Sequence, residues 1–275
     1  MHPLPDDISS IVANALGEDI GTGDLTAELV ANDLTANAKV IAREEAILCG
    51  TAWFDEVFKQ LDNTIVVHWL VADGDVIKPD QIICQVTGIA RMVLTGERTA
   101  LNFLQTLSGT ATVTQKFVKL LDGLDTKILD TRKTIPGLRK AQKYAVLCGG
   151  GFNHRMGLYD AILVKENHIA AAGSIRAVIL ATQKQKVPVE IEVENLQQLE
   201  EALTAGARHI LLDNFDLDDL RQAVRINQGQ AKLEASGAVD KSSIRSIAET
   251  GVDYVSIGSL TKHVRAIDFS MRFVD

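Results

Sequence analysis

The spacing of apolar residues along the chain changes character near residue 105 and separates two parts. In the first part, DDISSIVANALGED carries apolar residues at helical spacing, and TAWFDEVFKQL reads as a second helix. AKVIARE and AILCG read as strands, and TIVVHWLVADGDVIKPDQIICQVTG alternates apolar residues between DGD and KPD turn signals. This combination predicts an α/β sandwich with antiparallel strands.

A long apolar-periodic segment with few strand signals, residues 90–123, follows the first part. We read it as two helices, broken near Ser108 and Gly109, that bridge to the second part.

Short apolar runs alternate with helical patterns in the second part. Repeated β-α units of this length imply a parallel sheet with right-handed crossovers, and continuous apolar runs are typical of its buried strands. Six runs rather than eight predict an open, incomplete parallel α/β barrel over 106–266. Residues 1–105, completed by the C-terminal segment 267–275, would form the sandwich domain. The six runs are 127–131, 161–165, 187–194, 209–214, 232–237 and 254–258.

Each of these runs ends in, or is followed at once by, a polar residue or glycine. In a β/α barrel the C-terminal strand ends converge on one mouth, where catalytic groups lie. The first two ends supply cations and the next two supply carboxylates. The last two, ASG and IGS, supply small residues whose free backbone N–H groups can bind phosphate. The residues concerned are Thr131, Arg132, Lys133, Lys165, Glu192, Asp213, Ser236, Gly237, Gly258 and Ser259.

The distribution of charged residues indicates which class of ligand the predicted site binds. Seven basic residues lie between Arg132 and Lys165, with Asp160 as the only acid, in a chain of formal charge -8. A cationic island in an acidic protein favours a small polyanionic ligand over nucleic acid, and the aromatic content of 5% disfavours base stacking. Cations, a phosphate cradle and two acids suit a phosphorylated substrate with Mg²⁺.

Several candidate residues allow two interpretations, one functional and one structural. Arg139, Lys140 and Lys143 follow Pro136 in a helical pattern, where a solvated face is the expectation for Lys143 in particular. His154 reads equally as a ligand-contacting donor or as a surface histidine.

The segment CGGG at 148–151 is either a mobile anion-binding loop or a flexible turn, and for His168 we favour a structural role in capping the next helix. Glu190, Glu192 and Glu194 share one face of their strand, so at least one of them must meet a cation, a metal or water.

Cysteine usage and the N-terminal segment indicate the compartment. Three widely spaced cysteines, without a C-x-x-C pair, read as free thiols in a reducing cytoplasm. MHPLPDDISS lacks the features of a signal peptide, and no apolar stretch approaches the ~18 residues that span a membrane. We expect a cytoplasmic protein with no membrane partner.

Seven segments taken together resemble the quinolinate phosphoribosyltransferase family, also called nicotinate-nucleotide pyrophosphorylase (carboxylating). The resemblance runs from EDIGTGDLT near residue 18 to about residue 272. The segments are GERTALNFLQTLSGTAT, LDTRKTIPGLRKAQKYAV, CGGGFNHRMGLYDAILVKENHI, VEIEVENLQQLEEAL, ILLDNF, LEASG and GVDYVSIGSLTKHV.

The resemblance implies a sandwich domain, an open α/β barrel, and a homodimer whose active sites borrow residues from the other subunit. It implies conversion of quinolinate and phosphoribosyl pyrophosphate into nicotinate mononucleotide, pyrophosphate and carbon dioxide, with Mg²⁺, in NAD biosynthesis.

By motif position, the resemblance also implies roles for single residues. Arg98 would be donated across the dimer to quinolinate, and the carboxylate pocket would consist of Arg132, Lys133, His154 and Arg155. Lys165 would lie near phosphoribosyl pyrophosphate, and Glu192 and Asp213 would face the ribose and its Mg²⁺. Ser236, Gly237, Gly258 and Ser259 would bind phosphate. Ala238 stands where a second glycine is expected, a change that keeps the backbone N–H donors.

Three other functions compete with this one. A phosphoribosyltransferase-like paralogue with another substrate would need altered TRKT and NHR motifs, which are intact here. A Schiff-base lyase would use Lys165 at its strand end. A non-catalytic anion-binding protein would gain nothing from two acids opposite its cations.

Overall fold

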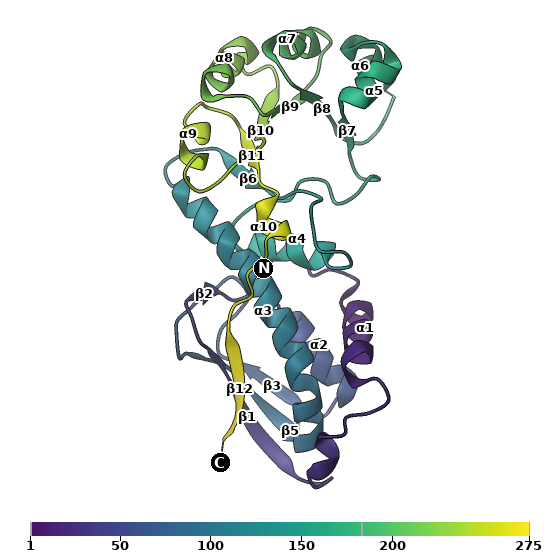
Figure 1. Cartoon of the computed structure of the whole chain (residues 1–275), viewed down its shortest axis with the longest axis vertical. Helices are drawn as coiled ribbons and strands as arrows, with labels where there is room; N and C mark the ends of the chain where they lie inside the picture. The colour runs from purple at the N-terminus through teal and green to yellow at the C-terminus, as the bar shows by residue number, and fades with distance from the viewer. Residues whose placement is uncertain (1, 183, 275) are drawn as a thin grey trace. The chain divides into compact units, whose positions relative to one another are not determined.

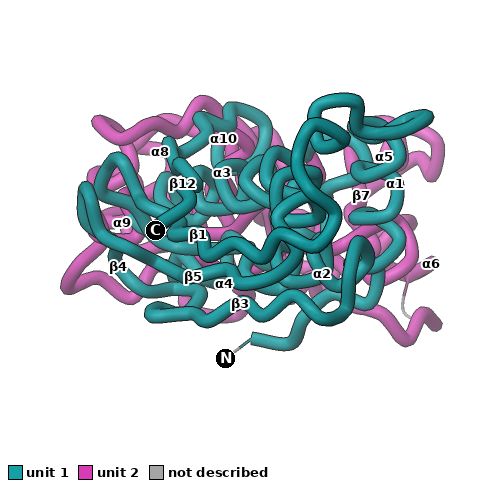
Figure 2. Tube along the Cα trace, turned by 90° about the horizontal axis from the view of Figure 1, so that it is seen from below, with its two compact units in different colours: residues 1–115, 134–150, 260–275 teal, residues 116–133, 151–259 magenta. Residues whose placement is uncertain are grey.

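The computed structural model describes residues 2–182 and 184–274; Met1, Gln183 and Asp275, which the predicted domains include, lie outside the described residues. Contacts group the chain into two compact units, coloured in Figure 2. Unit 1 consists of Met1–Gln115, Thr134–Gly150 and Leu260–Asp275, and unit 2 of Lys116–Lys133 and Gly151–Ser259. The domain bounds proposed from the sequence stay a prediction.

Unit 1 contains a four-stranded antiparallel sheet in the order β12-β1-β5-β3. Alternate residues of β1 are buried, so one face of the sheet packs on the core. Trp53, Phe54 and Phe58 of α2 fill that core. The elements are α1 (Ile8–Ile20), η1 (Ala27–Leu29), β1 (Thr35–Ala42), β2 (Ala46–Ile47), α2 (Thr51–Leu61), β3 (Val66–Trp69), β4 (Val76–Ile77), β5 (Ile82–Ile89), α4 (Arg139–Cys148) and β12 (Phe269–Val274).

The segment predicted as two helices is one helix, α3 (Ala90–Leu120), so the predicted break near Ser108 is wrong. Long-range packing explains why the helix continues. The Ser108 hydroxyl accepts a hydrogen bond from the Cys49 N–H and donates one to the Cys49 carbonyl. A side chain at Gly109 would collide with the backbone oxygen of Arg265, so glycine here permits a close approach rather than a turn.

The solvated position expected for Lys143 is also wrong. Lys143 is 0% exposed, within a helix whose residues 141–146 are all buried. Lys140, three residues earlier on the same helix, is partly exposed, and the Lys140 Nζ lies 2.6 Å from an Asp6 carboxylate oxygen.

Unit 2 is a six-stranded parallel sheet in the order β6-β11-β10-β9-β8-β7, and helices follow its outer side (Figure 1). β6 and β7 are its two edges, so the barrel is open and the predicted fold class is confirmed. The elements are β6 (Lys127–Leu129), β7 (Ile162–Val164), α5 (Glu166–Ala172), α6 (Ile175–Thr182), β8 (Val189–Val193), α7 (Leu196–Thr204), β9 (His209–Asp213), α8 (Leu217–Asn227), β10 (Lys232–Ser236), α9 (Ile244–Ala248) and β11 (Tyr254–Ser256). A short helix, α10 (Ser259–Lys262), follows β11.

The strand register decides which side chains share a face of this sheet. Glu192 is in register with Leu211, and Asp213 lies two residues beyond Leu211. Ser236 is in register with Asp213. Because register partners and residues two apart project to the same side, Glu192, Asp213 and Ser236 share one face.

No helix among the described residues has both the length and the apolar character needed to cross a membrane.

Candidate active site

The ends of β9 and β10 bring an acid and a glycine loop together. Asn214, next to Asp213, donates its backbone N–H to the Ser236 carbonyl at 2.9 Å. The Asn214 side-chain amide donates to the Asp213 carboxylate at 2.9 Å. A Cβ at Gly237 would lie 2.7 Å from the Asn214 side-chain oxygen, and the Gly237 φ of +142° also favours glycine. Asp213, Ser236 and Gly237 therefore lie together.

The ends of β6 and β11 form a second neighbouring pair of loops. The Ile257 N–H donates to the Leu129 carbonyl at 2.9 Å. A Cβ at Gly258 would lie 2.9 Å from Lys133 Cδ and 3.5 Å from the Thr131 hydroxyl. The same hydroxyl accepts the Lys133 backbone N–H at 3.1 Å. Gly258 thus leaves room for the lysine stem beside the loop that Ser259 begins.

Two arginines form the cationic wall of the site. Burial lowers the pKa of Arg155 below its ordinary value, and repulsion from Arg132 lowers it further. The Arg132 Nε is buried and has no hydrogen-bond partner among the described residues. A buried guanidinium N–H without an acceptor costs free energy. A bound anion would supply that acceptor and would also offset the repulsion between the two arginines, so this pair is suited to an anion.

Lys165 and Glu192 form an ion pair at the ends of β7 and β8. Their Nζ and Oε2 atoms are 2.7 Å apart, with the lysine side chain 45% and the glutamate side chain 10% exposed. His168 accepts the Lys165 backbone N–H at 3.0 Å and so caps α5, as predicted.

His154 is held from three sides. Its backbone N–H donates to the buried Asp130 carboxylate at 2.9 Å, and its Nδ1 accepts the Arg155 N–H at 2.7 Å. Because Nδ1 is an acceptor, the neutral ring carries its hydrogen on Nε2. That hydrogen points to Glu190, whose carboxylate oxygen lies 2.8 Å away.

Glu234 is a buried acid that the sequence analysis did not single out. It is 2% exposed, and its carboxylate lies 3.6 Å from His154 Nε2. Burial, followed by the charge of Glu190, raises the pKa of Glu234 to about 8. Alternation along β10 was the available signal, because Glu234 shares a face with Ser236.

Glu234→Gln is expected to change the pH dependence of stability. The unfolded glutamate releases its proton near pH 4.5, whereas the folded one retains it to about pH 8. The folded chain binds more protons between these values, so the contribution of Glu234 to stability falls as pH rises through this window. Relative to the wild type, the variant should therefore gain on the order of ten degrees of melting temperature from pH 4.5 to 8, then level off. A pH-independent difference in melting temperature would contradict this.

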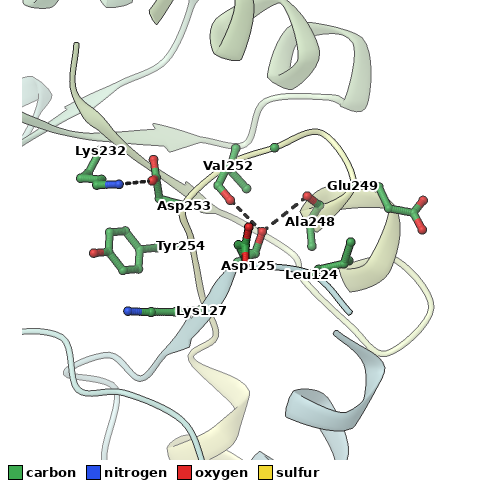
Figure 3. Close-up of a pocket in the computed structure, with 11 residues that line it drawn as sticks. Leu124, Asp125, Lys127, Lys232, Ala248, Glu249, Val252, Asp253 and Tyr254 are labelled. Carbon is green, nitrogen blue, oxygen red and sulfur yellow. Dashed lines mark hydrogen bonds and ion pairs between the residues drawn. The ribbon is translucent and has the colours of Figure 1, made fainter. Parts of the chain in front are cut away.

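A cavity of about 560 Å³ is lined by Asn153, His154, Arg155, Glu190 and Glu234, together with residues that begin strands of the sheet: Lys127, Val189, His209, Lys232 and Tyr254. Another cavity, of about 490 Å³, lies at the beginning of β6, β10 and β11 (Figure 3). There Lys232 pairs with Asp253 at 2.6 Å. This second cavity contains none of the predicted site residues.

The structure brings most of the predicted residues into unit 2, but not all of the cations. Arg98 is exposed on α3 in unit 1, so its predicted part in the site stays a prediction. Arg139, Lys140 and Lys143 also belong to unit 1, which divides the cationic island of the sequence between the units. Gly149 likewise packs in unit 1, closely against Ala111, which gives this glycine of CGGG a packing role.

This arrangement can hold a multiply charged anion and stabilise a developing positive charge. Arginines bind carboxylates through two parallel hydrogen bonds. Glu192 and Asp213, on one face, offer oxygen ligands of the kind that Mg²⁺ prefers. Gly237 and Gly258 permit close approach of phosphate to backbone N–H groups.

Comparisons with known proteins agree with the resemblance in the sequence. The family model of the quinolinate phosphoribosyl transferase N-terminal domain matches residues 24–108, and that of the C-terminal domain matches residues 110–272.

Relatives cover nearly the whole chain. A Bacillus subtilis (strain 168) protein named probable nicotinate-nucleotide pyrophosphorylase (carboxylating) is 43% identical, over 92% of this chain and 89% of its own length. A chloroplastic nicotinate-nucleotide pyrophosphorylase (carboxylating) of Oryza sativa subsp. japonica is 37% identical, over 98% of this chain and 78% of its own length. The solved nicotinate-nucleotide pyrophosphorylase of Francisella tularensis is 50% identical with a TM-score of 0.96, over 99% of this chain and 98% of that one.

Proposed function

This chain belongs to the quinolinate phosphoribosyltransferase family, and we propose that the strand ends of unit 2 carry the family's reaction. The enzyme transfers phosphoribose from phosphoribosyl pyrophosphate to quinolinate with decarboxylation, in NAD biosynthesis. The products are nicotinate mononucleotide, pyrophosphate and carbon dioxide.

One observation supports this use of the site above the others. Arg132 and Arg155 are near enough to repel, and a buried N–H of Arg132 has no partner among the described side chains. A dianion with two adjacent carboxylates, such as quinolinate, offers each guanidinium an acceptor. Lys133 directly follows Arg132 in the chain, and His154 directly precedes Arg155.

The proposed chemistry needs no nucleophile from the protein. The pyridine nitrogen attacks the anomeric carbon, and the bond to pyrophosphate breaks with its electron pair on the leaving oxygen. Positive charge develops on the ribose ring, as in glycoside cleavage, and the Glu192 and Asp213 carboxylates stabilise it. The pyridinium ring then accepts the electron pair of the departing carboxylate, and a proton takes its place as carbon dioxide leaves.

The pairing of Lys165 argues against a Schiff-base lyase. A Schiff-base lysine must present its amine to a carbonyl, whereas the Lys165 Nζ is engaged in an ion pair with the Glu192 carboxylate 2.7 Å away. We assign Lys165 to binding the phosphates of phosphoribosyl pyrophosphate, together with Ser236, Gly237, Gly258 and Ser259.

Mg²⁺ is part of the proposal, with Glu192 and Asp213 as its protein ligands, directly or through water. Their carboxylates share a face and offer only oxygen, which fits this ion. When bound, Mg²⁺ would neutralise charge on the pyrophosphate.

Asp213→Asn is expected to raise the Mg²⁺ concentration for half-maximal activity roughly ten- to a hundredfold, because it removes a charged ligand. A Mg²⁺ titration of initial rates measures this. Asp218→Asn, at an exposed acid on α8, is the matched control and should leave the titration unchanged. Equal midpoints for the two variants would exclude Asp213 from the ion.

We further propose a homodimer in which each active site takes Arg98 from the other subunit. We place the enzyme in the cytoplasm, because its three cysteines are free thiols.

A product assay tests the function directly. Purified protein receives phosphoribosyl pyrophosphate and Mg²⁺ with either quinolinate or nicotinate, and mass spectrometry follows nicotinate mononucleotide and carbon dioxide. Product from quinolinate alone is expected, whereas product from nicotinate alone would overturn the assignment of the two-carboxylate pocket.

A further inference from the structure

Three potential metal-binding side chains converge in unit 1. Cys49 follows β2, Asp73 lies in the turn between β3 and β4, and Cys148 ends α4. Their ligand atoms, two sulfurs and a carboxylate oxygen, all lie within 4.8 Å of one another. The cluster belongs to one unit and uses none of the residues assigned to catalysis.

Neighbouring groups orient two of these three ligands, Asp73 and Cys49. The Gly50 and Thr51 backbone N–H groups donate to one Asp73 oxygen at 3.0 and 3.2 Å, and the Tyr144 hydroxyl donates to the other at 2.9 Å. The Ser108 hydroxyl bonds to both the N–H and the carbonyl of Cys49 and so fixes its backbone. Outer hydrogen bonds of this kind orient metal ligands in known sites.

The charge balance of the cluster lacks a cation. Asp73 forms no ion pair with any described Lys, Arg or His. Beside it lie the Cys49 and Cys148 sulfurs, within 4.8 Å of the Asp73 carboxylate oxygen and of each other. A partly buried carboxylate without an ion pair, next to two thiols, is the environment that a thiophilic cation would neutralise.

We propose that Cys49, Cys148 and Asp73 bind a thiophilic divalent cation, Zn²⁺ in the first place, with a fourth position left to water. Two sulfurs and one oxygen suit Zn²⁺ in tetrahedral geometry and disfavour Mg²⁺, which takes oxygen ligands. Binding releases the two thiol protons as the sulfurs become thiolates. The site is separate from the proposed catalytic Mg²⁺ and does not depend on the proposed function.

The other cluster of possible ligands, His154, Glu190 and Glu234, is less suited to a metal. The Nδ1 of His154 accepts the Arg155 N–H, so the Nε2 facing the two acids carries the hydrogen. A metal on Nε2 would require that hydrogen to leave and would lose the bond to Glu190. This contrast favours the cysteine cluster as the metal site.

A bound cation would tie the end of α4 to two loops of unit 1. Cys148 lies at that end, and the chain continues through Gly149–Gly151 to His154 and Arg155. The cation would therefore anchor the chain just ahead of the proposed carboxylate pocket.

Co²⁺ titration of the reduced full-length protein tests the proposal. The expected result is a thiolate-to-cobalt charge-transfer band that saturates near one equivalent and disappears when Zn²⁺ is added. Cys148→Ser should abolish the band, and Asp73→Asn should weaken Co²⁺ binding at least about tenfold. Cys84→Ser, at a buried cysteine of β5 outside the cluster, is the matched control and should keep the band.

Asp73→Asn also separates metal binding from a purely structural role. Its amide oxygen can still accept the Gly50 and Thr51 N–H groups, so the apo melting temperature should change little while the band weakens. The absence of a charge-transfer band in the reduced wild type, or an equal band in Cys148→Ser, would overturn the site. Mg²⁺-dependent activity is a separate readout, so failure of the proposed function would not imitate either result.

Discussion

Arg132→Ala should lower kcat/KM for quinolinate by roughly two to three orders of magnitude while leaving the fold intact. Truncating one member of a buried, charged hydrogen-bonded pair costs about 2–5 kcal/mol, and each 1.4 kcal/mol is about tenfold in rate. Arg132 sits beside Arg155 with a buried N–H that lacks a partner in the described chain, so the lost interaction is with ligand rather than with protein. Steady-state kinetics with quinolinate, plus thermal melting, measure both halves of the prediction.

Two companion variants sharpen this test. Arg132→Lys keeps the charge but not the two-pronged geometry, so it should recover only part of the lost rate. Arg176→Ala removes an exposed arginine of α6 and should match the wild type. Unchanged kinetics in Arg132→Ala would remove this residue from the carboxylate pocket.

The parallel sheet was predictable because its signals are local. Each strand is a short apolar run, and all six appear where the sequence predicted them. The grouping of residues at the strand ends was predictable for the same reason, because the C-terminal ends of parallel strands lie at one side of the sheet. Asp213 beside Gly237 and Lys133 beside Gly258 follow from that topology together with the loop glycines.

What the sequence could not predict depends on distant contacts. Gly109 reads locally as a break, but its missing side chain lets Arg265, over 150 positions later, approach the helix. Lys143 reads as a solvated cation because its burial within α4 has no local signal. For Glu234, alternation along β10 indicated only the shared face with Ser236, and its raised pKa depends on Glu190 and His154, which come from other parts of the chain.

The division of the cationic island has a functional consequence. Counting charge along the chain joined seven basic residues into one feature, yet contacts place three of them in unit 1 and four in unit 2. Unit 2 retains the two arginines, Lys133 and Lys165. The family resemblance implies one further cation on quinolinate from outside this unit, Arg98, which is exposed on α3.

Mixed dimers of two inactive variants should recover activity if subunits share their sites. Arg98→Ala and Lys165→Ala chains, each with its own affinity tag, are co-expressed and purified through both tags. One site of such a dimer combines a wild-type Lys165 from one chain with a wild-type Arg98 from the other. Since a two-fold dimer has two sites, about half of the wild-type activity per dimer is expected, while each parent homodimer remains nearly inactive.

The decisive control pairs Arg132→Ala with Lys165→Ala in the same tagged format. Both residues lie in unit 2 of one chain, where Lys165 holds Glu192 at 2.7 Å. Neither site of that mixed dimer can contain both residues intact, so no recovery is expected. Recovery in the Arg98 mixture alone would identify Arg98 as a residue donated between subunits. Equal activity in the two mixtures, or none in a verified Arg98 mixture, would mean that each chain builds its site without its partner's Arg98.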